Sequence, residues 1–311
     1  GVFLIKGWRT VVWKKNRHKP NGAPIRGLVF TAVIDAIVAE ATVTTRRHRE
    51  KTIVWEESIR LAAAGLRHGF TERTGGVSVG VYGSLNLSLD VGDTVGDVLE
   101  NRRRFCEAVG CDILRLTTAC QDNEAHIVAV GPREAGAGAG SRYDALARTK
   151  ALMTDRTDMP LFLCAADSVP LVLFDDEHEA AAVAVCDILA LEQNLAGKVV
   201  TAMNIVYGSR CERLHAYIGP AVSPVHTTVG RAIAETLIGT VRRKTGILQK
   251  KGETVYADLK YLAVRQMVEA GMDISRFDIS KNCTYESAER FFSSRRSGGI
   301  CGRNAVFALL T

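Results

Sequence analysis

The sequence lacks a continuous apolar run long enough to span a membrane, and its cysteines never form a C-x-x-C pair. The longest apolar candidate, residues 180–191, is interrupted by Asp187 and has about half of the roughly 20 residues that a transmembrane helix needs. The eight scattered cysteines match neither a zinc ribbon nor a thioredoxin-like redox site. We therefore expect reduced thiols, a cytoplasmic location and no membrane partner.

Several common active-site patterns are also missing. The chain has no G-x-x-x-x-G-K-[ST] phosphate-binding loop. Its seven histidines include no H-x-H pair, which a multicopper oxidase site would need. A hydrolase built on Ser168 is not supported either, because Ser168 does not lie in a G-x-S-x-G elbow.

The net positive charge is concentrated in the first fifty residues. The formal charge of the chain is +6, but residues 1–50 hold ten Lys and Arg against three acidic residues, and the remainder holds 30 basic and 31 acidic residues. A nearly neutral main body does not indicate a nucleic-acid-binding face. We interpret residues 1–51 as a basic extension outside the fold or a mis-assigned start, and residues 52–311 as one domain. A basic arm for nucleic acid or anionic lipid and a mitochondrial-type targeting segment are the alternatives for the extension.

Apolar periodicity predicts strands and helices without a regular alternation. Helices are expected over residues 56–66, 95–109, 194–207, 229–237 and 258–270. Strands are expected over residues 127–130, 161–164, 169–174 and 180–185, the last three in one sheet, and in a segment ending at Ile218. This mixture favours a single layered α+β domain, with a mixed sheet and flanking helices, over a doubly wound parallel sheet.

Three segments, in order, resemble the laccase-domain (YfiH-like, purine nucleoside phosphorylase-like) family. They are HGFTERTGGVSVGVYGSLNLSLDVGD at residues 68–93 with ENR at 100–102, IGPAVSP at 218–224, and CTYESAERFFSSRRSGGICGR at 283–303. The resemblance covers about residues 52–311. It implies an α+β fold of the family's own type and phosphorolysis of purine nucleosides, with adenosine deamination alongside, although members are often labelled multicopper polyphenol oxidases.

The resemblance also implies a zinc site of two histidines and one cysteine, and this chain departs from all three. Asn123 stands at the histidine of the family's Q-V-H-G segment, and Ser168 stands at the cysteine of its A-D-C-V-P segment. The histidine of the H-A-G-W segment should follow a strand ending near Val185, but no histidine lies between residues 179 and 214. A carboxamide and a hydroxyl are poor zinc ligands. We expect no metal cofactor and a catalytically degenerate copy; the alternative is an active zinc-dependent phosphorylase or deaminase with substitute ligands.

Polar residues kept in the family-like motifs are the candidates for ligand binding. They are Arg73, Asn86, Arg295, Arg296 and Arg303. Arginine binds phosphate and stacks on purine rings. We therefore expect a purine nucleoside or phosphate as the partner, while the glycine-rich loop (residues 71–84) and the FFSSRR tail (residues 291–296) are also consistent with needs of the fold alone. We assign no catalytic residue.

Overall fold

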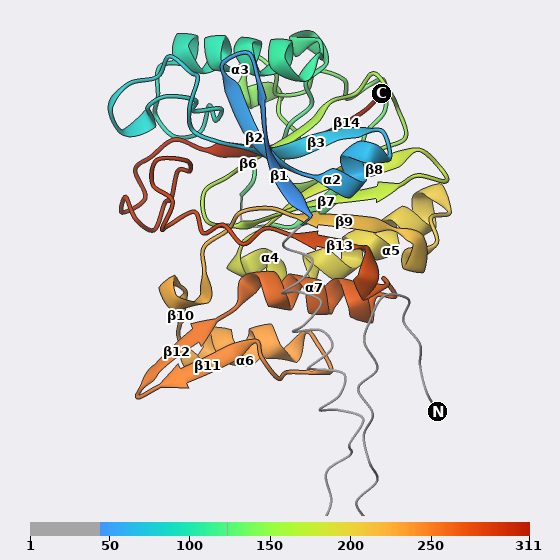
Figure 1. Cartoon of the computed structure of the whole chain (residues 1–311), viewed down its shortest axis with the longest axis vertical. Helices are drawn as coiled ribbons and strands as arrows, with labels where there is room; N and C mark the ends of the chain where they lie inside the picture. Colours follow the sequence, from blue (N-terminus) through green and yellow to red (C-terminus); the bar gives the residue numbers. More distant parts are fainter. Residues whose placement is uncertain (1–43, 123) are drawn as a thin grey trace, which may run out of the picture.

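The computed structural model describes residues 44–122 and 124–311, which form a layered α+β fold (Figure 1). Two β-sheets pack face to face in the middle. Helix α3 (Val95–Val109) covers the outer face of one sheet, and α4 (Ile188–Glu192), α5 (Leu195–Tyr207) and α7 (Leu259–Glu269) cover the outer face of the other. The predicted α+β class, with a mixed sheet and flanking helices, is confirmed. Residues 1–43, most of the predicted extension, lie outside the described residues.

The strands of the described residues form three sheets. The five-stranded sheet is antiparallel throughout, in the order β1 (Thr45–Glu50), β2 (Ile53–Ser58), β3 (Leu66–Thr71), β14 (Asn304–Leu310) and β6 (Leu161–Ala165), with α2 (Ile59–Ala63) between β2 and β3. The mixed six-stranded sheet has the order β13 (Phe277–Ile279), β9 (His215–Ile218), β7 (Val169–Asp175), β8 (Ala180–Cys186), β5 (Thr149–Thr154) and β4 (His126–Ala129), with parallel pairs at both edges. A small antiparallel sheet of β10 (Thr228–Val229), β12 (Thr254–Ala257) and β11 (Leu248–Lys251) lies with α6 (Arg231–Gly239) beyond α7 (Figure 1).

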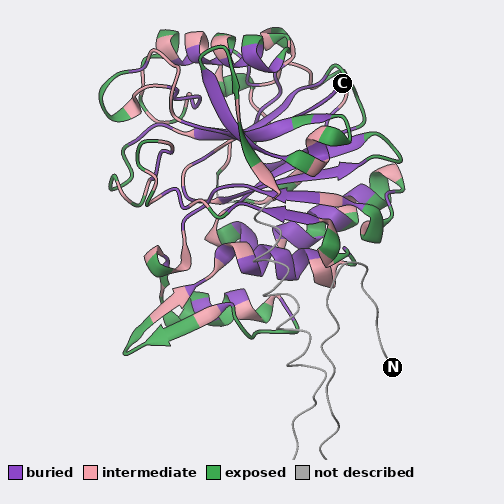
Figure 2. Ribbon diagram, in the orientation of Figure 1, coloured by how far each residue is buried: buried purple, intermediate pink, exposed green. Residues whose placement is uncertain are grey.

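Strand β8 shows how the sheets and helices share their cores. Ala181, Val183 and Val185 face the five-stranded sheet, whereas the residues between them face the helical layer. Successive residues of a strand point to opposite faces, so a strand covered on both faces is apolar throughout. All seven residues of β8 are buried, like most of the central strands in Figure 2.

Helix α3 is fixed to the five-stranded sheet by an aromatic cluster. Phe105 lies 5.6 Å from Phe162 of β6 and 5.0 Å from Phe307 of β14, measured between ring centroids. Gly110 ends the helix with a φ of 71°, and its N–H donates to the carbonyl of Cys106. Arg102 lies on the same buried face of α3 as Phe105, and it is only 3% exposed.

Most of the predicted elements are confirmed. Residues 95–109 form α3, and residues 169–174 and 180–185 lie in the antiparallel pair β7–β8. Asp258 starts α7 by accepting the N–H of Tyr261. No helix in the described part of the chain is long and apolar enough to cross a membrane.

Three local predictions differ from the structure. Residues 56–66 are not one helix, because β2 continues through Ser58, whose side chain then caps α2. Strand β6 does not join β7 and β8 in one sheet but pairs with β14 in the other. Residues 45–50, placed in the extension for their charge, form β1 and pair with β2 along their whole length, so strand structure begins before Thr52.

Candidate functional site

A cavity of about 410 Å³ opens where β6 and β8 end and β7 begins. Cys164, Ser168 and Val185 contribute to its wall from these strand ends, and the loops of residues 88–91 and 118–122 contribute further lining residues. Small-molecule sites usually have volumes of about 300–1,000 Å³. The cavity therefore brings the Ser168 and Val185 regions, singled out in the sequence, into one site of suitable size.

Ser168 is positioned by its neighbour Asp167. The φ of Asp167 is 84°, in a region that residues other than glycine rarely adopt. Its buried carboxylate accepts hydrogen bonds from Thr284 Oγ1 (2.6 Å), Ser293 Oγ (3.0 Å) and the N–H of Arg295 (2.7 Å). These bonds offset the backbone strain and tie the turn before β7 to the C-terminal segment.

Arg102 brings a buried positive charge to the cavity wall. Its guanidinium donates to the carbonyl oxygens of Leu87 (2.9 Å), Gly138 (2.6 Å) and Ala139 (2.8 Å). It also lies 5.3 Å from the centre of the Phe162 ring. Burial lowers the pKa of Arg102, but an arginine stays cationic at neutral pH.

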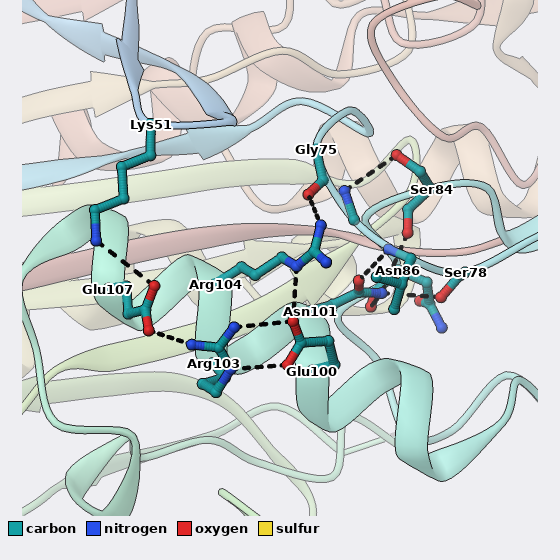
Figure 3. A network of polar contacts seen from close by, with 12 residues as sticks. Lys51, Gly75, Ser78, Ser84, Asn86, Glu100, Asn101, Arg103, Arg104 and Glu107 are labelled. Carbon is teal, nitrogen blue, oxygen red and sulfur yellow. Dashed lines mark hydrogen bonds and ion pairs between the residues drawn. The ribbon is translucent and has the colours of Figure 1, made fainter.

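The glycine-rich loop is fastened to α3 by Asn101 (Figure 3). The Asn101 amide donates to Ser78 Oγ (2.9 Å) and to the Ser84 carbonyl (3.2 Å). A Cβ on Gly76 would lie 2.2 Å from the Ser84 carbonyl oxygen, so only glycine fits there. Ser78 lies in a G-V-S-V-G stretch, but it is buried in a loop and donates to Asp93 (2.6 Å), unlike the exposed serine of a nucleophile elbow.

Among the five residues expected to bind a ligand, all of them described, Arg303 alone lines the cavity. Its guanidinium donates to the carbonyl oxygens of Cys301 (2.8 Å) and Gly302 (3.1 Å). Asn86 is fully buried behind it and accepts the Arg303 N–H at 2.9 Å. Asn86 therefore supports Arg303 instead of facing the cavity.

The other three expected arginines lie elsewhere on the C-terminal segment and the glycine-rich loop. Arg73 donates to the Gly83 carbonyl and lies 4.4 Å over the ring of Phe292. Arg296 donates to the carbonyl oxygens of Thr284 (2.6 Å), Tyr285 (2.8 Å) and Phe291 (2.7 Å). Arg295 is exposed. These contacts within the fold explain the presence of Arg73 and Arg296 in the motifs without a ligand.

Sequence reasoning missed several cavity residues, among them Asp90, Arg102, Arg142 and Asp187. The sequence could have indicated that Arg102 is buried, because it lies on the same face of the predicted helix as Val98 and Phe105. Arg142 pairs with Asp90 at 3.3 Å; Asp90 lies in a loop and Arg142 in a three-residue 3-10 helix, and neither segment is long enough to show a periodic pattern.

The described residues that line the cavity include no histidine, the residue type that the family resemblance implies for two of the three zinc ligands. Asn123 lies outside the described residues, and its neighbours Gln121 and Asp122 line the cavity. Across residues 44–122 and 124–311, no group of three or more His, Cys, Asp or Glu side chains could hold a metal ion. Burial raises the pKa of Cys164 to about 11 and also raises that of Cys120, so both cavity thiols are protonated at neutral pH.

Comparison with known proteins identifies the family. Residues 67–311 match the family model described as multi-copper polyphenol oxidoreductase laccase. The chain is 28% identical over 240 residues to the purine nucleoside phosphorylase YlmD of Bacillus subtilis. This alignment covers 77% of this chain and 86% of that protein. It is 30% identical over 246 residues to the purine nucleoside phosphorylase YlmD of Geobacillus stearothermophilus, and this alignment covers 78% of this chain and 90% of that protein.

Solved structures agree with these matches. The crystal structure of YlmD from Geobacillus stearothermophilus aligns with a TM-score of 0.81 at 28% identity, covering 85% of this chain and 97% of that one. That of the Bacillus licheniformis protein YfiH gives 0.79 at 27% identity, covering 84% and 97%. This chain therefore belongs to the laccase-domain family of YfiH and YlmD.

Proposed function

We propose that this protein binds a purine nucleoside or phosphate in the cavity beside Ser168 and does not carry out metal-dependent phosphorolysis. The observation that carries the proposal is the composition of the cavity wall. Ser168 and Asp187 line it near the places where the family resemblance puts a cysteine and a histidine, and its described lining residues include no histidine. The relatives named purine nucleoside phosphorylases support the choice of ligand.

The cavity wall offers groups that complement such a ligand. Arg102, Arg142 and Arg303 supply positive charge for phosphate or a surface for stacking on a purine. The carboxylates of Asp90 and Asp122 can accept hydrogen bonds from ribose hydroxyls. Binding therefore needs no cofactor, and none is proposed.

Isothermal titration calorimetry with adenosine, inosine and phosphate tests the binding. We expect the wild type to bind at least one of them and Arg303→Ala to bind it about 10-fold more weakly or worse, because a hydrogen bond to a charged group contributes about 1.5–3 kcal/mol. Arg103→Ala is the matched control, since Arg103 pairs with Glu100 and Glu107 on the exposed side of α3. A wild type that binds none of the three ligands contradicts the proposal.

The absence of turnover is tested separately, with zinc added and with YlmD of Bacillus subtilis as the positive control. We expect no phosphorolysis of adenosine or inosine and no deamination of adenosine. The competing function is an active zinc enzyme with substitute ligands from the cavity carboxylates and thiols. It requires one zinc ion per purified chain and turnover that a chelator abolishes, and those two results together would replace our proposal.

A further inference from the structure

A lysine side chain is directed to the cavity residue Asp187 from a β-bulge. His126 of β4 pairs with Thr149 of β5, but the next residue, Ile127, pairs with Ala151, so Lys150 is the extra residue between them. Bulges often re-aim a side chain next to a functional site. The Lys150 side chain is only 3% exposed, and its Nζ forms an ion pair with Asp187 Oδ2.

Both carboxylate oxygens of Asp187 are therefore engaged by the protein itself. Oδ1 accepts the N–H of Ala190 at 2.8 Å and caps α4, while Oδ2 contacts the Lys150 ammonium. A metal ion that took Asp187 as a ligand would have to displace the ammonium. A buried ammonium without its partner is costly, and an ammonium left in place repels a divalent cation.

We infer that Lys150 is the built-in counter-ion of the cavity carboxylate Asp187 and occupies the position that a metal ion bound to Asp187 would need. The Lys150–Asp187 pair joins β5 to the start of α4 and neutralises a carboxylate of the cavity wall. It thereby disfavours a divalent metal ion at Asp187. The inference concerns the charge of the cavity, so it stands independently of nucleoside binding.

Charge variants of the full chain test this inference. Each protein is treated with a chelator, dialysed with or without zinc chloride, and measured for bound zinc and melting temperature. We expect the wild type to melt at the same temperature with and without zinc. Lys150→Gln should melt lower by about 5 °C or more, because Asp187 loses its cation, and should gain little from zinc, because one freed carboxylate is too few ligands for a zinc site.

Lys150→Glu provides the sharpest result, because it sets a second carboxylate against Asp187. Zinc should raise the melting temperature of this variant by about 3 °C or more and bind at about one ion per chain. Lys198→Glu is the matched control at an exposed position of α5, and it should show no response to zinc.

Three outcomes would overturn the inference. The first is wild-type protein that holds one zinc ion per chain and loses it in Asp187→Asn. The second is Lys150→Glu responding to zinc no more than Lys150→Gln does. If Lys150→Glu does not fold, Lys150→Gln decides alone: a melting temperature equal to that of the wild type would show that Lys150 is not a required counter-ion.

Discussion

At the scale of single residues, burial keeps His68 neutral and makes the protein less stable in acid. His68 is fully buried; its Nε2 accepts the N–H of Ser58 (3.0 Å), and its Nδ1–H donates to the Leu66 carbonyl (3.0 Å). Burial lowers the pKa of His68 from 6.5 to about 4. Between these pH values the unfolded chain binds a proton that the folded protein does not. The free energy of unfolding therefore falls as the pH falls from 6.5 to 4, by about 1.4 kcal/mol per unit and about 3 kcal/mol in total.

His68→Gln should remove this contribution, because a glutamine carbonyl can still accept the Ser58 N–H but does not titrate. Denaturant unfolding between pH 7.5 and 4.5 measures the effect. We expect the free energy of unfolding to fall less steeply with acid in His68→Gln than in the wild type. Equal slopes in the two proteins would contradict a buried, neutral His68.

Residues of the cavity show how much of a site one sequence can reveal. Ser168 and Arg303 could be found because they lie in recognisable motifs, and both line the cavity. Arg73 and Arg296 lie in the same motifs but serve the backbone, since a motif does not say which of its side chains faces the ligand. Lys150 could not be found, because it reaches Asp187 through strand pairing and a bulge that periodicity does not encode.

At the scale of elements, β1 shows that charged residues can hold a strand in place. None of its six residues is buried, so apolar periodicity could not predict it, whereas the apolar patterns of α3 and β8 predicted both elements. The strand is held by its pairing with β2, by Arg46–Glu57 and Arg47–Glu72 ion pairs, and by His48 stacking on Trp55 at 4.4 Å.

Deletion of residues 1–50 should therefore destabilise the protein relative to deletion of residues 1–43. The longer deletion removes β1, uncovers Trp55 and takes the Arg47 cation from the buried carboxylate of Glu72, leaving Arg290 (2.7 Å) as an ion-pair partner. We expect a melting temperature lower by about 3–6 °C, which corresponds to about 1–2 kcal/mol for a domain of this size. Thermal unfolding of the two proteins side by side makes the comparison, and equal melting temperatures would show that β1 adds nothing to stability.

At the scale of the whole molecule, the last strand of the chain lies inside a sheet. β14 pairs with β3 on one side and with β6 on the other. Val306 and Ala308 face the core between the two sheets, whereas Ala305 and Phe307 face the core under α3. The sequence shows that this segment is apolar but not which strands it joins, because pairing between residues near 70 and near 306 is a long-range property. The prediction that residues 161–164, 169–174 and 180–185 lie in one sheet is wrong for this reason, because β6 pairs with β14 in the other sheet.

Deletion of residues 304–311 should accordingly abolish the folded state. The deletion would separate β3 from β6, create two unpaired strand edges and open two apolar cores at once. Truncation of a buried Phe to Ala alone costs about 3–5 kcal/mol, and a whole domain is stable by only about 5–15 kcal/mol. We expect no cooperative thermal transition and no near-UV circular dichroism signal from the deleted protein. Phe307→Leu keeps the strand and should still unfold cooperatively, at a lower temperature, which separates the loss of pairing from the loss of one side chain. A deleted protein that stays soluble and unfolds cooperatively would show that both cores can form without β14.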